Sequence, residues 1–549
     1  MLMPALRLAM AQINPTVGDL EGNSAKILEQ IQKALDLGSH LVLFPELALT
    51  GYPIEDLALS KDFLNESGKA LEGLAKELAN LGLGHIRVVV GHPALAKNPT
   101  AWAIGQNCAS LIFDGKVQAS YAKHHLPNYS VFDEYRVFVP GDDLLTFEVD
   151  GLRFATVICE DIWQSGGPVA QIANHKVDLT LVLNGSPFER SKTDTRLELV
   201  SNLAARQETA VAYVNLIGGQ DELVFDGNSF LIDASGKEIA RAKQFEEDLV
   251  VFEIENKNSI KAVSESTPTK EDLAQVWNAL VLGLRDYVYK NGFKSVVLGL
   301  SGGIDSAVCA AIAVDAIGAK NVVGVSLPSK YSSDHSMSDA ALLAKNTGLI
   351  YSTEPIEPYV EQFVEKLKLQ GLAAENLQAR VRAVILMAKS NTDGHLLLST
   401  GNKTELAVGY STIYGDAAGG YAPIKDVQKT LVWDLARYRN ELAQQQGETP
   451  PIPESSITKP PSAELRPDQL DQDSLPEYAV LDRILELHIE QRMSESEIIA
   501  QGLDAVTVES VLRLVSASEW KRRQSAIGPR ITKLAFGRER RLPITRRSK

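Results

Sequence analysis

Long apolar runs and paired cysteines are both missing from this 549-residue sequence. No stretch approaches the roughly 18 consecutive apolar residues that a membrane-spanning helix needs, so we expect the chain to have no place in a membrane. The three cysteines, Cys108, Cys159 and Cys309, form no CxxC pair, and neither a zinc site nor a disulfide framework is expected. The N-terminal segment lacks a basic start, an apolar core and a small-residue cleavage site, which predicts a cytoplasmic protein.

An overall excess of positive charge is missing as well. The net charge is −15, which argues against a protein that binds nucleic acid through a broad basic field. The exception is the C-terminal tail, residues 520–549, where eleven Lys or Arg stand against one acidic residue. Its local balance of +10 leaves −25 for the remainder of the chain. This basic tail is either a solvated end or a set of cations that contact the phosphates of a small anionic substrate.

Chain length and hydrophobic patterning indicate two large α/β domains, with room for a third, because 549 residues exceed what one hydrophobic core organises. Residues 1–255 alternate short Val/Ile/Leu-rich runs with segments of helical spacing, which predicts a layered α/β domain. A polar stretch, 256–270, has little apolar periodicity and is predicted to be a linker. The predicted strands of this first domain include 41–44, 86–91, 154–159 and 178–184.

Residues 271–549 predict a second α/β domain. Its strand–helix–strand alternation implies a parallel sheet with right-handed crossovers. The segment 448–478 holds seven prolines, so we predict a lid loop without regular structure, followed by a helical tail over 478–523. The other predicted elements are a helix over 271–290, strands over 295–300, 322–329 and 395–400, and a helix from about Ser306.

A candidate nucleophile, Cys159, ends a predicted strand in the segment FATVICEDIW. A lone cysteine is more often a core residue, and Cys108 and Cys309 are interpreted in that way. Cys159 differs because two other segments place Glu46 just past a strand and Lys123 in YAKHHLPNYSVFDEYRVF. A cysteine nucleophile needs a base for its proton and a cation or donor for the oxyanion, and a Glu and a Lys can supply both.

These three segments resemble the carbon–nitrogen hydrolase, or nitrilase, family over about residues 4–250. The resemblance implies a four-layer αββα sandwich and a Glu–Lys–Cys triad. In that triad Glu46 is the general base, Lys123 stabilises the tetrahedral intermediate and Cys159 forms a glutamyl thioester. The resemblance also implies that glutamine is bound by Tyr129, Glu134, Ser186 and Lys192. Two of these residues have another interpretation, because Ser186 could instead cap a turn and Lys192 could be a solvated cation.

A second candidate site is the run GLSGGIDSAV, residues 299–308, which follows a predicted strand and opens a helix. Backbone N–H groups of a Gly-rich turn and of a helix N-terminus bind phosphate oxygens. The run has neither the GK[ST] ending of a Walker A loop nor a GxGxxG pattern. It resembles the pyrophosphatase loop of the adenylating ATPases, in a doubly wound domain of the adenine nucleotide alpha hydrolase type. The resemblance implies that the domain uses ATP and Mg²⁺ and that Asp305 helps to hold the metal ion. It also implies that ATP is bound by Gly299, Leu300, Ser301, Gly302, Gly303, Ile304, Asp305 and Ser306.

The segment 398–430 resembles the corresponding motif of the NAD synthetase family, and the long Pro-rich loop matches the glutamine-using members. Asn376, in ENLQARVRA, and Lys521, in SEWKRRQ, resemble residues of that family that contact deamido-NAD, although each could be a helix surface position. The resemblance further implies Thr400 and Lys429 at ATP, Glu405 at the metal and the substrate, and Asp416 near the nicotinate carboxylate.

Together the two resemblances imply a carbon–nitrogen ligase that uses glutamine as its amide donor. The expected reaction is deamido-NAD + ATP + glutamine + water → NAD + AMP + pyrophosphate + glutamate. They also imply an internal ammonia tunnel and a homo-oligomer, a dimer or higher. One alternative is another adenylating amidotransferase that acts on a different carboxylate. A second is a regulatory protein with inactive sites, which the intact Glu46, Lys123 and Cys159 set beside an intact SGGIDS loop argues against.

Overall fold

The computed structural model describes residues 5–467 and 469–546. The chain folds into two compact units. The first consists of the residues up to Gln220 together with Val224–Glu271, and the second of Asp221–Leu223 together with the residues from Asp272 on. Within the described ranges, no helix is both long and apolar enough to cross a membrane.

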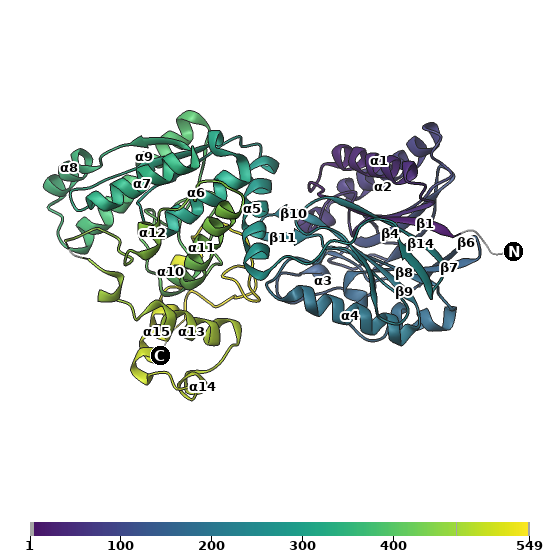
Figure 1. Cartoon of the computed structure of the whole chain (residues 1–549). Helices are drawn as coiled ribbons and strands as arrows, with labels where there is room; N and C mark the ends of the chain where they lie inside the picture. Colours follow the sequence, from purple (N-terminus) through teal and green to yellow (C-terminus); the bar gives the residue numbers. More distant parts are fainter. Residues whose placement is uncertain (1–4, 468, 547–549) are drawn as a thin grey trace. The chain divides into compact units, whose positions relative to one another are not determined.

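Two β-sheets form the centre of the described part of the first unit (Figure 1). The first sheet has the strand order β15-β14-β1-β2-β3-β4-β5, and the second has the order β13-β12-β9-β8-β7-β6. The strands of the first are β1 (Leu6–Gln12), β2 (Leu41–Leu43), β3 (Arg87–Leu95), β4 (Gly105–Phe113), β5 (Lys116–Ala122), β14 (Asp248–Asn256) and β15 (Ser259–Ala262). Those of the second are β6 (Leu145–Val149), β7 (Leu152–Ile158), β8 (Leu179–Asn184), β9 (Ala210–Asn215), β12 (Phe230–Ile232) and β13 (Glu238–Arg241). A short hairpin pairs β10 (Ile217–Gln220) with β11 (Leu223–Asp226).

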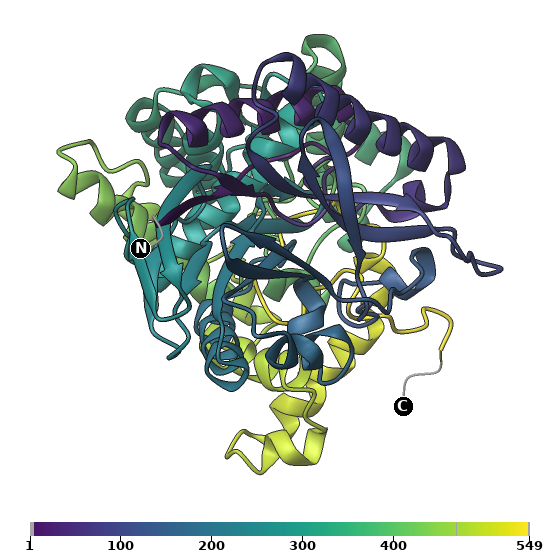
Figure 2. The ribbon, with the colours of Figure 1, turned by 90° about the vertical axis from the view of Figure 1, so that its right-hand side faces the viewer.

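Helices cover the outer faces of both sheets. The helices α1 (Leu20–Asp36) and α2 (Lys61–Asn80) pack on the first sheet, and α4 (Lys192–Gln207) packs on the second (Figure 1, Figure 2). Helix α1 begins after Asp19, whose carboxylate accepts the backbone N–H of Gly22, and it buries apolar residues at helical spacing toward the sheet. The αββα sandwich predicted from the sequence is thereby confirmed.

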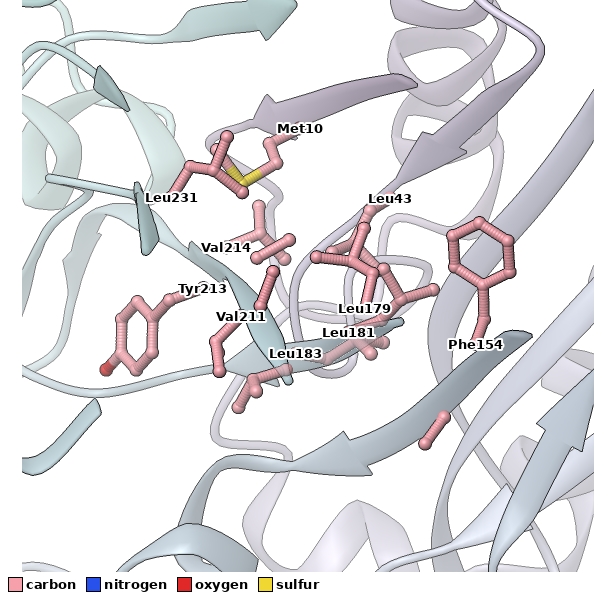
Figure 3. Close-up of a cluster of buried hydrophobic side chains, with 14 of the residues drawn as sticks. Met10, Leu43, Phe154, Leu179, Leu181, Leu183, Val211, Tyr213, Val214 and Leu231 are labelled. Atoms are coloured by element: carbon pink, nitrogen blue, oxygen red, sulfur yellow. The ribbon is translucent and has the colours of Figure 1, made fainter. Parts of the chain in front are cut away.

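The inner faces of the two sheets share one hydrophobic core, shown in Figure 3. Met10 and Leu43 from the first sheet face Leu181, Val214 and Leu231 from the second, and all five are buried. Alternate residues of each strand point into this layer because side chains in a strand alternate between faces. Burying one such side chain contributes about 1.5–3 kcal/mol, so this core fixes the positions of the strand ends.

The predicted linker over 256–270 is wrong in its middle part. Residues Ser259–Ala262 form β15, which pairs antiparallel with β14 at the edge of the first sheet. The backbone N–H of Thr267 also donates to the carbonyl of Arg241. Ladder hydrogen bonds to β14 outweigh the polar composition of this stretch, and β-propensity depends strongly on such context.

A parallel four-stranded sheet with the order β18-β17-β16-β19 lies at the centre of the described part of the second unit. The chain first builds β16, β17 and β18 outward in one direction and then returns to place β19 on the other side of β16. The order therefore reverses between β16 and β19, and ligands of such doubly wound sheets bind beyond the strand ends at that point. The elements are α5 (Asp272–Lys290), β16 (Val296–Gly299), α6 (Ile304–Ile317), β17 (Val322–Ser326), α7 (Asp334–Thr347), β18 (Ile350–Thr353), α8 (Glu357–Leu367), α9 (Leu372–Asp393) and β19 (Leu396–Leu397).

The C-terminal part of the second unit is helical, as the sequence predicts. Helices α13 to α15 pack with α10 around a core that includes Val408, Leu481, Ile498 and Val511 (Figure 1). The lid prediction over 448–478 is wrong in one respect, because α12 forms inside it. These elements are α10 (Lys403–Val408), α11 (Lys429–Gln445), α12 (Glu454–Thr458), α13 (Tyr478–Leu485), a π-helical turn (Glu486–Glu490), α14 (Glu495–Ile499), α15 (Ala505–Ala517) and α16 (Glu519–Arg522).

Candidate active sites

Glu46 and Lys123 form a buried ion pair in the first unit. Glu46 lies just beyond β2 and Lys123 directly follows β5, so the two strand ends bring them together. Nζ of Lys123 lies 2.7 Å from Oε1 of Glu46. The Glu46 carboxylate also accepts hydrogen bonds from the side-chain amide of Asn107, at 2.7 Å, and from the backbone N–H of Gly185, at 2.8 Å. A buried charge needs this kind of full pairing, and the contacts hold the Glu46 carboxylate in one orientation.

Glu134 provides a second carboxylate for the same ammonium. It begins the short helix α3 (Glu134–Val137), and its Oε2 lies 2.8 Å from Nζ of Lys123. The hydroxyl of Tyr52 donates to Glu134 at 2.8 Å. Burial is the main reason that the pKa of Glu134 is raised to about 7, while the Lys123 ammonium opposes that rise. The structure thus directs Glu134 at Lys123, whereas the family resemblance implied a contact with glutamine.

Cys159 begins a 3-10 turn (Cys159–Ile162) that directly follows β7. Its φ is +40°, a left-handed conformation that costs free energy for a non-glycine residue and that clusters at functional sites. The pKa of the Cys159 thiol is raised well above its ordinary value, first by burial and then by the Glu46 carboxylate, whereas the Lys123 ammonium lowers it. Both charges therefore act on the sulfur. A protonated thiol needs a base before the sulfur can attack, and Glu46 can serve as that base.

Two of the residues predicted to bind glutamine contact the turn that carries Cys159. The hydroxyl of Tyr129 donates to Glu160 at 2.9 Å, while 53% of Tyr129 is exposed to solvent. Nζ of Lys192, at the start of α4, lies 5.9 Å from the ring centroid of Trp163. Tyr129 therefore contacts the turn itself, and Lys192 lies near Trp163, the residue that follows this turn.

Ser186 is buried next to Gly185, whose N–H binds Glu46. Its hydroxyl accepts a hydrogen bond from Nε of Arg196 at 3.1 Å. The Arg196 guanidinium also forms a buried ion pair with Asp226 at 2.7 Å and donates to the carbonyl of Ser186. The sequence analysis missed Arg196, because an arginine on an amphipathic helix carries no signal that it is buried.

In the second unit a cavity of about 510 Å³ lies beyond the strand ends at the β16/β19 switch point. Within the predicted ATP loop, residues 299–306, Gly302 alone does not line the cavity, although its conformation shapes the loop. Its φ is +76°, and a Cβ there would lie 2.2 Å from the carbonyl oxygen of Ser336, so only glycine fits. The predicted residues that line the cavity are Gly299, Leu300, Ser301, Gly303, Ile304, Asp305, Ser306, Asn376, Thr400, Glu405, Asp416, Lys429 and Lys521.

Lys429 bridges the two acidic residues that were predicted to hold a metal. Its Nζ lies 2.5 Å from Oδ2 of Asp305 and 3.3 Å from Oε1 of Glu405. The side-chain amide of Asn402 donates to the other Asp305 oxygen at 2.8 Å. Burial, and then the Asp305 charge, raise the pKa of Glu405 to about 8, while Lys429 opposes that rise. Two carboxylates and one ammonium therefore meet in the cavity wall.

The residues predicted to contact deamido-NAD gather around the segment 409–416. The Asp416 carboxylate accepts the backbone N–H of Thr412 at 2.7 Å, and the Asn376 side chain accepts the Thr412 hydroxyl at 2.8 Å. Nζ of Lys521 donates to the carbonyls of Gly409 and Ser411 at 2.9 and 3.0 Å. Asn376 and Lys521 lie on helices, and both line the cavity.

The Pro-rich segment 448–478 supplies one wall of the cavity through residues 459–465. The hydroxyl of Ser456, in α12, donates to the carbonyl of Gly302 at 3.0 Å. The Glu464 carboxylate accepts the hydroxyl of Ser336, at the start of α7, at 2.7 Å. The first contact ties the segment to the Gly-rich loop and the second ties it to α7, and its role as a lid stays a prediction. Residue 468 lies outside the described residues.

The interpretation of the basic tail as a solvated end is wrong for much of its described part, whereas its contact with substrate phosphates stays a prediction. Among the described tail residues, Lys521 is the cation that lines the cavity. Several others pair with acidic side chains, such as Arg522 with Glu519 at 2.8 Å, Arg540 with Glu519 at 3.3 Å, and Arg530 with Glu539. The tail is therefore largely an internally paired segment, and its last three residues lie outside the described range.

Comparisons with known proteins agree with this two-site arrangement. The carbon–nitrogen hydrolase family matches residues 7–261, and the NAD synthase family matches residues 276–525. The chain is 46% identical to a glutamine-dependent NAD(+) synthetase of Acinetobacter baylyi over 99% of this chain and 98% of the relative. It is 42% identical to the enzyme of that name from Thermotoga maritima, with 100% of both chains covered.

A solved structure of a glutamine-dependent NAD+ synthetase from Acinetobacter baumannii, in complex with adenosine diphosphate, is similar along the whole chain. It has a TM-score of 0.77 and 43% identity, with 98% of each chain covered. The sequence analysis identified the resemblance to both families. The relatives above 40% identity match this chain over almost its full length and therefore cover both family regions, and each region contains one of the two sites described above. The chain belongs to the family of glutamine-dependent NAD(+) synthetases.

Proposed function

We propose that this chain amidates deamido-NAD to NAD, with ATP as the activating substrate and glutamine as the source of nitrogen. It is a carbon–nitrogen ligase. The observation that carries the proposal is the pairing, in one chain, of a buried Cys159 beside the Glu46–Lys123 ion pair with a cavity lined by the Gly-rich loop and the Asp305–Lys429–Glu405 group. Glutamine hydrolysis and carboxylate activation each need one of these sites.

At the first site, Glu46 takes the proton from the Cys159 thiol, and the sulfur attacks the amide carbon of glutamine. Lys123 donates to the carbonyl oxygen as it gains negative charge. The C–N bond then breaks, the amine takes the proton from Glu46, and ammonia leaves a glutamyl thioester. Water, deprotonated by Glu46, cleaves the thioester and releases glutamate and the free thiol. The ammonia then serves as the nitrogen donor at the second site.

We assign the remaining residues of the first site by their contacts. Ser186 and Lys192 hold the α-amino and carboxylate ends of glutamine, and Tyr129 lies beside the substrate, which its contact with Glu160 in the Cys159 turn supports. Ser186 adds a hydroxyl fixed by Arg196. Glu134 orients the Lys123 ammonium.

At the second site, the loop N–H groups and Ser301 and Ser306 bind the ATP phosphates, with Thr400 beside them. The deamido-NAD carboxylate attacks the α-phosphorus of ATP and pyrophosphate leaves. Ammonia then attacks the activated carboxyl carbon, and AMP leaves. Lys429 turns from the two carboxylates toward the phosphates. Asn376, Asp416 and Lys521 contact deamido-NAD.

The donor set at this site fits Mg²⁺. Asp305 and Glu405 offer hard carboxylate oxygens, and Mg²⁺ commonly binds through one or two carboxylates together with substrate phosphates. The Lys429 ammonium, placed between the two carboxylates, marks a position that favours a cation. Asp305 and Glu405 would hold the ion, and its charge would neutralise that of the phosphates when bound.

We further propose that the chain forms a homo-oligomer through α8 and works in the cytoplasm. Tyr359, Phe363 and Leu367 lie four residues apart on α8 and expose 55%, 50% and 61% of their surfaces. A stripe of this kind is typical of an interface, and a second copy of the chain can cover it symmetrically. Light scattering on Phe363→Glu should show a smaller particle than the unmodified chain, and an unchanged mass would reject α8 as the interface.

The proposal of a cytoplasmic location rests on the nucleophile, because a cysteine nucleophile is suited to a reducing compartment.

The test of the function is NAD formation from deamido-NAD, ATP and glutamine, with AMP and glutamate measured in the same reaction. One NAD, one AMP and at least one glutamate per turnover are expected. Glutamate and AMP formation only with another carboxylate would favour the alternative amidotransferase. A chain that forms neither product would be the regulatory protein with inactive sites.

A further inference from the structure

Asp161 lies in the turn that carries Cys159 but does not belong to the proposed triad. It is fully buried, and its carboxylate accepts four hydrogen bonds. Oδ1 accepts the backbone N–H of His125 at 2.8 Å and of His124 at 3.1 Å. Oδ2 accepts the Tyr121 hydroxyl at 2.6 Å and the backbone N–H of Ile158 at 2.9 Å.

These four donors come from the two segments that carry Lys123 and Cys159. Tyr121 precedes Lys123 by two residues, and His124 and His125 follow it directly, whereas Ile158 is the residue before Cys159. The two segments extend from β5 and β7, which belong to different sheets, so no ladder of backbone hydrogen bonds joins them. The Asp161 carboxylate is a direct polar link between the strand end that carries the ammonium and the strand end that carries the thiol.

We infer that Asp161 is a positioning residue that sets the Lys123 ammonium against the Cys159 sulfur. The inference rests on the proposed glutamine hydrolysis. The chemistry of the site requires a carboxylate, because four donors converge and an ionised carboxylate offers only acceptors. An amide in its place would turn an NH₂ group toward N–H or O–H donors on one side. Two of the four contacts would then be lost, either those of His124 and His125 or those of Tyr121 and Ile158, and in both cases a contact with the Lys123 segment is lost.

Reaction rates depend steeply on such placement, and an error of about 1 Å at the reacting groups can cost roughly a hundredfold. None of the four donors to the Asp161 carboxylate belongs to the groups assigned to glutamine binding, Tyr129, Ser186 and Lys192. A displaced ammonium should therefore slow thioester formation and leave glutamine binding largely intact. A purely structural role would instead change stability, kcat and KM together.

The experiment compares Asp161→Asn with Asp233→Asn in the full chain. Asp233 is a matched control in the same unit. Its carboxylate also accepts two backbone N–H groups, of Ser235 at 2.8 Å and Lys237 at 3.0 Å, and the Ser235 hydroxyl, but in a surface turn after β12. The measurements are kcat and KM for glutamine hydrolysis, the melting temperature, and NAD formation from ammonium.

We expect Asp161→Asn to lower kcat for glutamine roughly 10- to 100-fold. KM for glutamine should stay within about threefold, and NAD formation from ammonium should be unchanged. Asp233→Asn should leave all three values at the level of the unmodified chain. Tyr121→Phe removes one of the four donors without adding a donor, and it should lower kcat less, in the same direction. It decides the question if Asp161→Asn does not fold.

Three results would overturn the inference. The first is a kcat within twofold of the unmodified chain in Asp161→Asn. The second is an equal loss with glutamine and with ammonium, which would mean a general structural defect. The third is a Tyr121→Phe variant with unchanged kcat when Asp161→Asn is unfolded. An unmodified chain that does not hydrolyse glutamine would refute the proposed function itself, before any variant is compared.

Discussion

Lys123 and Glu46 lie 2.7 Å apart and are almost completely buried, with exposed fractions of 1% and 0%. The ammonium also contacts Glu134, so one cation stands between two carboxylates. Removal of one of these three charged side chains strongly destabilises the folded protein, because an uncompensated buried charge remains. The arrangement therefore makes isosteric substitutions the right probes, since they keep the shape of the site and remove one charge or one proton acceptor.

Glu46→Gln should lower the rate of glutamine hydrolysis by about 10²–10⁴, the range typical for loss of a general base. NAD formation from ammonium should persist, because the second site lies in the other unit. The matched control is Glu247→Gln, a surface carboxylate of the same unit paired with Lys26. Steady-state glutaminase assays measure the effect. Normal hydrolysis in Glu46→Gln would remove Glu46 from the role of base.

Asp305→Asn and Glu405→Gln should each abolish NAD formation with either nitrogen source. Both side chains line the cavity beside Lys429, and loss of a carboxylate that holds a phosphate-bound cation costs roughly a thousandfold in rate. Asp434→Asn is the control, since Asp434 lies on the exposed face of α11 beside Arg437. The assay is NAD formation over a Mg²⁺ titration. Near-normal rates in both variants at saturating Mg²⁺ would contradict the assignment.

Lys521→Ala should raise KM for deamido-NAD more than KM for ATP. A hydrogen bond to a charged group contributes about 1.5–3 kcal/mol, which corresponds to roughly 10- to 150-fold in affinity. Arg541→Ala serves as the control, because Arg541 is an exposed tail cation whose side chain contacts the carbonyl of Arg538. An unchanged KM for deamido-NAD in Lys521→Ala would leave this lysine with only its contacts to Gly409 and Ser411.

Gly302→Ala should damage the ATP loop more than a glycine substitution in a comparable backbone conformation. Gly302 and Gly394 both have φ near +75°, but a Cβ at Gly302 would lie 2.2 Å from a Ser336 oxygen and one at Gly394 meets nothing within 4 Å. The left-handed conformation alone costs about 1–2 kcal/mol in each variant. We expect Gly302→Ala to lose additional thermal stability and to raise KM for ATP. Equal melting temperatures and equal KM values in the two variants would contradict the steric account.

Strand ends explain what the sequence could predict of the first site. Glu46 and Cys159 follow short apolar runs, and strand ends in α/β folds commonly present functional side chains, whereas Lys123 follows the alternating strand β5 and was indicated by its motif. The family resemblance then supplied their roles. It could not show that Glu134 turns toward Lys123, because the same helix position could direct a carboxylate to substrate.

The supporting contacts could not be predicted, because packing between distant elements creates them. Asn107 lies within β4, Arg196 within α4, and Asp161 in a turn, and each has a partner 30 or more residues away in sequence. Local polarity was also misleading for β15 and α12. Hydrogen bonds to β14 and to the Gly302 carbonyl stabilise these segments despite their composition.

The central claim is that Cys159 supplies ammonia to a separate synthetase site, and Cys159→Ala tests it most directly. Cys108→Ala is the control, since Cys108 is a second buried cysteine of the same unit, and either truncation costs about 1 kcal/mol of stability. NAD formation is measured first with glutamine and then with ammonium at a pH that supplies free ammonia. The account predicts that Cys159→Ala loses synthesis from glutamine and keeps synthesis from ammonium, while Cys108→Ala keeps both. Synthesis from glutamine in Cys159→Ala, or loss of both activities in a folded variant, would contradict it.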